Sequence, residues 1–462
     1  MAQRKIGADP FEPEPRARAA PQLCYPRTLV DRRSSGTVAL TAARARRFAA
    51  PRALKWAIGA ALLALAAAVI VLELFSTPRF PTPTGPYRVG TRIYPAWTDA
   101  ARPEPFTADT ADRRQVVVQI WYPTQTEGPK QRYVEHRETL VPLAARFHVP
   151  AFLFRRIENA PTHAVLNAPA AEGRFPVLLN PTGFYGFRDV SLFWIEELAS
   201  HGYVVVGMDQ PGTAAATVLA AGHVIPAMSK SEFDRYMPLA LSRSTNKTPV
   251  LNGVPLPEGV IPFLAEDLRF VLGRVQALDR EDPVLAGHLD GQNSGVFGVS
   301  LGGYAGPEAC RVDRRFRACL AVDAGQTAAV VREGLEQPLM IISRDADVMR
   351  AERGEAGGWP EPEIAHTIES QRALFAHSRG DAYYVTMNGM YHVNWTDAPI
   401  WTPVVRWIGL AGPIDPYRGF AQTNAYTLAF FDRYLKGQRS PLLDSTAGVL
   451  PGDRLEARHA RR

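Results

Sequence analysis

Seven short apolar segments constrain the fold of this 462-residue chain more than any other feature. They are rich in Val, Ile, Leu and Tyr and lack alternating polar residues, which is typical of strands covered on both faces. Helical patterns lie between several of them, at 191–202 and 263–279, and another lies near the end of the chain, at 425–437. Strands that alternate with helices predict an α/β fold with a mostly parallel central sheet flanked by helices. The segments are 116–123, 175–180, 203–209, 296–300, 318–323, 339–343 and 382–388.

Residues 211–262 interrupt this alternation. Strand patterns are absent there, and the stretch "PVLNGVPLPEGVIP" (249–262) is typical of a loop. Long irregular insertions in compact domains often serve as lids or binding loops. We therefore predict a cap-like insertion over the functional site at about 211–262.

An uncharged apolar run of 17 residues lies near the N-terminus, at 56–72. About 20 apolar residues span a bilayer, with roughly 17 near the lower limit. Basic residues precede the run, so the positive-inside rule predicts a cytoplasmic tail and an exported body, on the periplasmic or extracellular side. We favour an uncleaved signal-anchor. A cleaved signal peptide, which would leave a secreted protein, and a buried soluble helix are the alternatives.

Charge is distributed unevenly along the chain. Residues 1–55 hold 12 Lys/Arg and 4 Asp/Glu, a net charge of +8, so the remainder carries +6 − 8 = −2. The tail is too polar to form a core and is predicted to be disordered. The nearly neutral remainder gives no indication of nucleic-acid binding. The predicted organisation is a basic tail (1–55), a transmembrane segment (56–75), a main domain (76–440) and a C-terminal tail (441–462).

Cysteine spacing gives no indication of a metal site. Cys24, Cys310 and Cys319 form neither a CxxC motif nor a Cys/His ligand pattern. We expect free thiols, no metal ion and no organic cofactor.

A G-x-S-x-G motif, residues 298–302, places Ser300 between Gly298 and Gly302. This pattern marks a sharp strand-to-helix turn that lifts the serine hydroxyl above the sheet, and its strained backbone requires small neighbours. An apolar strand precedes the motif and a helix-compatible stretch follows it, although Pro307 should kink that helix. Ser300 is therefore the candidate nucleophile.

A serine nucleophile needs a general base, which follows it in this chain order. Three histidines follow Ser300 and precede the predicted C-terminal tail: His366, His377 and His392. His392 follows the last predicted strand, at the sheet edge where catalytic groups of open α/β sheets gather. His366 and His377 flank a predicted helix and fit surface positions better. His392 is the candidate base.

The acid that orients the base has three candidates. Asp323 ends one predicted strand, and Asp345 and Asp347 follow the next, in "LMIISRDADV". Each loop can present a carboxylate to the histidine, whose tautomer the acid holds. Spacing alone leaves the choice open.

Attack on a carbonyl also requires two N–H donors for the developing oxyanion. One is expected from Leu301, the residue after the nucleophile. The other is expected from the glycine-rich loop after an early strand, "LLNPTGFYGFRDV" (178–190). Phe184 is the favoured donor there, with Gly183 and Tyr185 as neighbours.

Several spaced motifs together resemble the plasma, or isoform II-type, platelet-activating factor acetylhydrolases, over about residues 85–436. The resemblance implies an α/β-hydrolase fold and calcium-independent cleavage of short or oxidised sn-2 acyl chains from phospholipids. By position it implies Ser300 as nucleophile, Asp323 as acid, His392 as base, and the N–H groups of Phe184 and Leu301 as the oxyanion hole. The motifs are "GPYRVG" (85–90), "IWYP" (120–123), "GFYGFRD" (183–189), "EELASHGYVVVGMDQPG" (196–212), "GVSLGG" (298–303), "RRFRACLAVDAG" (314–325) and "MYHVNW" (390–395).

The expected function is that of a serine esterase acting on short-acyl esters, with a small-molecule or lipid ester as substrate and the membrane as partner. Two alternatives remain. One is a lipase or polyester hydrolase that uses Asp347 as acid, since "SRDADV" resembles the acid loop of bacterial polyester-hydrolysing lipases. The other is a catalytically inactive, membrane-anchored binding module.

Overall fold

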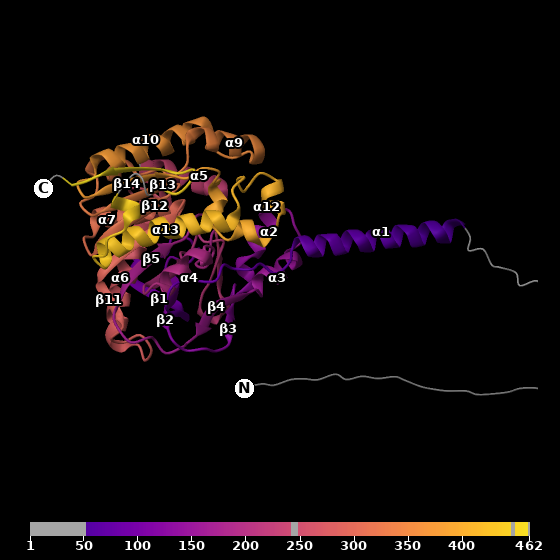
Figure 1. Ribbon diagram of the computed structural model, residues 1–462, viewed down its shortest axis with the longest axis horizontal. Coiled ribbons are helices and arrows are strands. Elements are labelled where there is room, and N and C mark those ends of the chain that lie inside the picture. The colour runs from indigo at the N-terminus through magenta and orange to yellow at the C-terminus, as the bar shows by residue number, and fades with distance from the viewer. Residues whose placement is uncertain (1–51, 242–247, 445–448, 461–462) are drawn as a thin grey trace, which may run out of the picture. The chain divides into compact units, whose positions relative to one another are not determined.

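The computed structural model describes residues 52–241, 248–444 and 449–460 (Figure 1). An 11-stranded sheet has the order β15-β14-β13-β12-β11-β5-β6-β2-β1-β4-β3. Its strands from β14 to β6 run parallel, which confirms the predicted α/β architecture. They are β1 (Arg88–Pro103), β2 (Arg113–Thr124), β3 (Lys130–Arg132), β4 (Pro161–Leu166), β5 (Phe175–Pro181), β6 (Val204–Asp209), β11 (Leu289–Val299), β12 (Phe316–Val322), β13 (Leu339–Ser343), β14 (Ala382–Thr386) and β15 (Arg454–Arg458).

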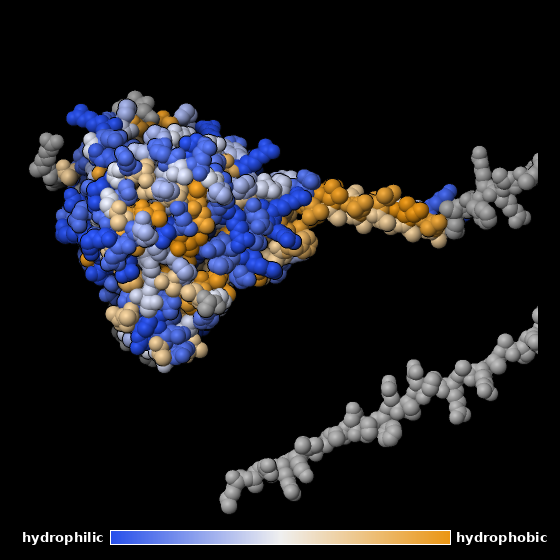
Figure 2. All heavy atoms as spheres, turned by 90° about the horizontal axis from the view of Figure 1, so that it is seen from below, coloured by the Kyte–Doolittle hydropathy of each residue, from blue (hydrophilic) through white to orange (hydrophobic). Residues whose placement is uncertain are grey.

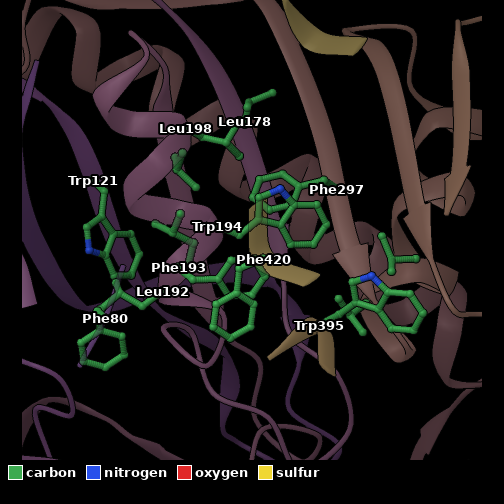
Figure 3. Packing of buried hydrophobic residues seen from close by; sticks show 14 of the residues in the cluster. Phe80, Trp121, Leu178, Leu192, Phe193, Trp194, Leu198, Phe297, Trp395 and Phe420 are labelled. Carbon is green, nitrogen blue, oxygen red and sulfur yellow. The ribbon is translucent and has the colours of Figure 1, made fainter. Parts of the chain in front are cut away.

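Helices cover both faces of the sheet, so successive strand residues enter two different apolar clusters. Leu178 packs with α4 (Leu192–Ser200) and α13 (Pro416–Leu435), in the cluster that Figure 3 shows. Its neighbours Val177 and Leu179 pack in the opposite cluster. The helices of that second cluster include α6 (Val260–Glu281), α7 (Leu301–Val312), α8 (Ala328–Glu333) and α10 (Glu361–His377).

Short helices connect these layers. They are η1 (Arg137–Thr139), α2 (Val141–Arg146), η2 (Ala151–Phe154), α3 (Arg155–Glu158), α9 (Ala346–Ala356), η4 (His392–Trp395), α11 (Ala398–Trp401), α12 (Val404–Trp407) and α14 (Pro441–Asp444).

The segment 211–262 is more regular than its sequence predicts. Its described part forms two small hairpins on either side of one helix. Its elements are β7 (Ala216–Val218), η3 (Ala220–Gly222), β8 (Val224–Pro226), α5 (Lys230–Leu241), β9 (Val250–Leu251) and β10 (Val254–Pro255).

The predicted C-terminal tail (441–462) is instead partly built into the sheet. β15 pairs antiparallel with β14, and Leu455 is buried against it. The sequence analysis missed this strand because its other residues are largely exposed and polar. It missed β1 for the same reason, since β1 is only partly buried.

Among the described residues, one helix is long and apolar enough to cross a membrane. This helix, α1, covers Arg52–Leu74 and has a mean hydropathy of 2.5 over its most apolar window. Figure 2 shows its surface as apolar over most of its length, and none of its residues is buried. Its length and composition fit the predicted transmembrane segment, although it begins four residues before the expected bound. Residues 1–51 of the predicted basic tail lie outside the described residues.

Candidate active site

Ser300 occupies the sharp turn between β11 and α7. Its backbone has φ 57° and ψ −122°, a strained conformation for a residue with a side chain. Its N–H donates to the Val322 carbonyl at 3.0 Å, which ties the turn to β12. A Cβ on Gly302 would lie 2.2 Å from the Pro181 carbonyl oxygen, and one on Gly298 would lie 2.7 Å from the backbone of Gly302. Both glycines are therefore required by close backbone approach.

Pro307 lies within α7, and a side chain compensates for its missing N–H. In a regular helix the N–H of residue 307 would bond to the Gly303 carbonyl. The Gln326 amide donates to that carbonyl instead, at 3.2 Å. The helix that supports Ser300 thus continues through the proline.

His392 and Asp323 lie close together although 69 residues separate them. His392 begins η4, shortly after β14, and Asp323 directly follows β12. Nδ1 of His392 is 2.6 Å from Oδ2 of Asp323. The Asp323 side chain is fully buried, whereas that of His392 is 23% exposed. This geometry leaves the other ring nitrogen available to a reacting group.

A buried arginine contacts the same carboxylate. Nε of Arg344 donates to both oxygens of Asp323, at 3.1 Å each, and its Nη1 pairs with Glu352. Burial opposes ionisation of Asp323, but the charges of Arg344 and His392 outweigh it and hold the pKa of this carboxyl below its usual value. Asp323 is therefore ionised at neutral pH.

The two other acid candidates lie elsewhere. Asp347 pairs with Arg350, and its side chain is 93% exposed. Asp345 pairs with Arg454 near the start of α9. Within the described part of the chain, neither carboxylate forms a hydrogen bond with His392.

The predicted oxyanion loop lies against the nucleophile. A Cβ on Gly183 would lie 3.3 Å from the Ser300 Cβ, so the loop contacts the serine directly. Phe184 follows Gly183, and its ring stacks on Phe233 of α5 with centroids 4.0 Å apart. Leu301 is the first residue of α7, a position whose N–H has no acceptor within the helix.

Ser300 and His392 both line a cavity of about 490 Å³, together with Gly183 and Phe184. Glu352 also reaches this cavity. Most of the remaining wall is apolar and includes Phe75, Leu143, Phe147, Trp401, Val405 and Ile408.

The walls of this cavity differ from the predicted cap. None of the residues that line it belongs to 211–262; they come instead from 143–154, 180–191 and 393–410, among others. The insertion supports the lining residues from outside the cavity. Phe233 stacks on Phe184, the Tyr185 N–H donates to the Thr213 carbonyl, and the Ala215 N–H donates to the Gly186 carbonyl. Sequence reasoning missed the true walls because short helices with mixed composition have no cap-like pattern.

The other predicted residues lie away from the site. His366 and His377 lie within α10 rather than flanking it and do not line the cavity; His377 is exposed as expected, whereas His366 is half-buried rather than at the surface. Cys310 and Cys319 are buried free thiols, and Cys24 lies outside the described residues. Among the described residues, no group of three or more His, Cys, Asp or Glu is arranged to hold a metal ion.

Sequence reasoning also missed Arg344 and Glu352. Arg344 immediately precedes Asp345 in a loop that the sequence analysis singled out, but nothing local distinguishes it from a surface arginine. Only the tertiary structure shows it fully buried beside Asp323.

Known proteins resemble this chain in sequence and fold. The family model "Platelet-activating factor acetylhydrolase, isoform II" matches residues 72–237, a segment that includes Phe184 and ends before Ser300. A platelet-activating factor acetylhydrolase from Cavia porcellus is 21% identical over 397 residues, covering 83% of this chain and 84% of that protein. The solved structure of a ferulic acid esterase from Streptomyces cinnamoneus is 26% identical, with a TM-score of 0.62 over 82% of this chain and 99% of that chain. These similarities confirm the predicted resemblance and the α/β-hydrolase fold, and they support a carboxylic ester hydrolase.

Proposed function

We propose that this chain, an α/β-hydrolase-fold protein similar to platelet-activating factor acetylhydrolases and to an esterase, hydrolyses carboxylic esters through an acyl-enzyme on Ser300. The observation that carries the proposal is the 2.6 Å hydrogen bond from His392 to the buried Asp323, beside a cavity that His392 shares with Ser300. A strained serine, an imidazole and a buried carboxylate at one cavity are the parts that acyl transfer requires.

In the proposed mechanism, His392 accepts the Ser300 proton as Oγ attacks the ester carbonyl. The ionised Asp323 holds the imidazole in the required tautomer and stabilises the imidazolium. The alcohol leaves with the proton from His392. Water, activated by the same imidazole, then hydrolyses the acyl-enzyme and frees Ser300.

The tetrahedral intermediate carries a negative charge that needs preorganised donors. We assign this role to the backbone N–H groups of Phe184 and Leu301. Support comes from the contact of Gly183 with Ser300 and from the position of Leu301 at the N-terminus of α7. The dipole of this 12-residue helix also favours negative charge there.

The substrate we favour is a phospholipid with a short sn-2 acyl chain. Support comes from the matched family and from a cavity that is larger and more apolar than an acetyl group requires. The apolar helix α1 supports a position at a membrane, with the main domain on the exported side. Signal cleavage would instead release a secreted enzyme.

The test uses full-length protein in detergent and p-nitrophenyl esters of rising acyl length, beside a short-chain phospholipid. Fluorophosphonate should label the wild type and not Ser300→Ala, and this variant should lose at least about 10³-fold in kcat. Short acyl groups should be turned over fastest. Unlabelled wild-type protein, or full activity in Ser300→Ala, would exclude the proposal and favour a binding module. Faster turnover of long chains would refute the acyl preference alone.

A further inference from the structure

Arg344 is fully buried beside the proposed catalytic acid. Its guanidinium bridges two carboxylates: Nε bonds to both oxygens of Asp323, and Nη1 bonds to Glu352, which lines the active-site cavity. The ring of Trp359 lies 5.1 Å from its central carbon and contacts the imidazole of His392 edge-on, with centroids 5.0 Å apart. Arg344 therefore contacts the carboxylate of the pair directly, and Trp359 lies against both Arg344 and His392.

The cost of burying this cation indicates a specific role. An unpaired buried charge is strongly destabilising, and even a paired one often contributes no more stability than an apolar side chain of similar size. Arg344 also has one buried nitrogen, Nη2, without a hydrogen-bond partner in the described chain. Stability alone is therefore a weak explanation for its presence next to Asp323.

We propose that Arg344 and Glu352 form a positioning pair for the acyl-transfer reaction. Arg344 fixes the rotation of the Asp323 carboxylate so that Oδ2 meets His392, and Glu352 balances the charge of Arg344. This inference rests on the proposed function, because it assumes that Asp323 orients His392.

The balance of charge explains why both residues are needed. A guanidinium near Asp323 keeps the carboxylate ionised but opposes the positive charge that His392 gains during catalysis. The carboxylate of Glu352 offsets that opposition without contacting the imidazole. Arg344 alone would orient the acid and weaken the base, whereas the pair orients the acid at little electrostatic cost.

Other titratable groups around this pair remain in every variant below and act as a constant background. They are Tyr304 of α7, Glu363 of α10, Tyr384 of β14, and Tyr391 next to η4.

The test is the pH profile of kcat/KM for p-nitrophenyl acetate with full-length protein. Arg344→Met removes the cation, so kcat should fall about 10- to 100-fold and the acid limb should move to higher pH by about one unit. Arg344→Lys keeps the positive charge but removes the planar guanidinium that bonds to both carboxylate oxygens, so kcat should fall while the acid limb stays in place. Glu352→Gln leaves Arg344 unbalanced, so the acid limb should move to lower pH.

Opposite shifts in Arg344→Met and Glu352→Gln are a signature that general destabilisation would not produce. Thermal unfolding measures whether each variant is folded. If Arg344→Met does not fold, the pH profiles of Arg344→Lys and Glu352→Gln test the inference instead. Acid limbs that stay unchanged in Glu352→Gln, or that move with Arg344→Lys, would overturn the inference. A fully active Ser300→Ala or Asp323→Asn would instead overturn the proposed function on which it rests.

A second, independent observation concerns Phe75, the residue directly after α1. Phe75 lines the active-site cavity, is 8% exposed, and packs edge-on against Phe154 with centroids 6.0 Å apart. The Arg156 side chain donates to the Leu72 carbonyl in the last turn of α1, at 3.0 Å. The end of the apolar helix is therefore attached to the wall of the cavity.

We infer that Phe75 is a specificity-determining residue that contacts the apolar part of the ester. This inference rests on the proposed function, because it assumes that the cavity binds the ester. If a membrane holds α1, the same attachment keeps the cavity beside the lipid. Cleavage after Phe75 would then remove part of the substrate site, so the mature chain must retain this residue.

Phe80 offers a matched control for this inference. It is equally buried and follows α1 by a few residues, but it packs on Tyr133 and does not line the cavity. Phe75→Ala should lower kcat/KM for p-nitrophenyl octanoate about tenfold and leave that for the acetate within twofold, because an apolar contact is lost. Phe80→Ala should leave the octanoate-to-acetate ratio unchanged.

Phe75→Leu is the variant of choice if Phe75→Ala unfolds, and it should change the ratio in the same direction. An unchanged or raised octanoate-to-acetate ratio in folded Phe75 variants would overturn the inference. If fluorophosphonate does not label the wild-type protein, the proposed function is wrong instead.

Discussion

Burial distinguishes the carboxylates that compete for His392. Asp323 has no exposed side-chain surface and contacts both Arg344 and His392, whereas Asp347 lies almost entirely in water. A carboxylate that orients an imidazole must be held rigidly and desolvated, because water would compete for the hydrogen bond. The residue-level contrast therefore gives a sharp mutational expectation.

Asp323→Asn should lower kcat by about 10³- to 10⁴-fold, because the amide favours the wrong imidazole tautomer. Asp347→Asn and Asp345→Asn should stay within about twofold, since both side chains are exposed. Initial rates on p-nitrophenyl acetate measure all three. A larger loss in Asp347→Asn than in Asp323→Asn would identify the polyester-hydrolase arrangement instead.

A second residue-level expectation concerns Asp189, which lies near the end of the predicted oxyanion loop (178–190) and interacts with Asp209. Burial raises the pKa of Asp189 to about 7, against the opposing charge of Arg188. A carboxyl whose pKa is higher in the folded state stabilises the fold at low pH, and this contribution is lost as pH rises from about 4 to about 7. The charged form is thus the unfavourable one.

Asp189→Asn should remove this pH dependence. Urea unfolding at pH 5 and pH 8 should show a smaller difference in unfolding free energy for the variant than for the wild type, by more than about 1 kcal/mol. Asp347→Asn serves as a control because its carboxylate is exposed. Equal pH dependence in wild type and Asp189→Asn would show that Asp189 stays ionised throughout.

At the level of elements, α7 contains a proline within two turns of Ser300 and still continues as a helix. Pro307 leaves the Gly303 carbonyl without its helical donor, and Gln326, from the loop after β12, supplies one. Gly303 lies three residues after Ser300, so this loop contact supports the turn that carries the proposed nucleophile.

Gln326→Leu should therefore destabilise the protein by about 1–3 kcal/mol, because it leaves a buried carbonyl unpaired. The cost should be smaller in a Pro307→Ala background, where the new N–H can bond to Gly303. Chemical unfolding of both single variants and the double variant measures the coupling. Strictly additive effects would mean that Gln326 does not compensate for the proline.

At the scale of the whole molecule, the cavity is assembled from segments that lie far apart in the chain. Its walls join the end of α1, the short helices around 143–154 and the stretch 393–410, with Ser300 and His392 at one side. Phe75, the residue directly after α1, therefore lines the same cavity as Ser300 and His392. The apolar character of α1 is the feature to test.

Leu65→Arg places a charge in the middle of α1, where it should cost about 2.5–3.5 kcal/mol of insertion free energy. The variant should move from the membrane fraction to the soluble fraction, whereas Leu65→Ile should remain with the membrane. Carbonate extraction and immunoblotting measure this partition. Identical partition of both variants would favour a soluble helix or a cleaved signal.

Local patterns in the sequence determined much of this protein. The buried strands, three long helices, the turn at Ser300 and the apolar helix near the N-terminus all follow from residues close together in the chain. Strands that are buried on both faces of the sheet have continuous apolar sequences. The tight turn at Ser300 requires glycine at its neighbouring positions. Partly exposed strands such as β1 and β15 have no such pattern and were missed.

The tertiary structure alone decided which distant groups meet. The order of β12, β13 and β14 in the sheet brings Asp323 and His392 together and directs Asp347 to solvent. The same packing buries Arg344 against Asp323 and forms the cavity from short helices rather than from 211–262. Such contacts join residues that are far apart in the sequence, so local sequence patterns cannot predict them.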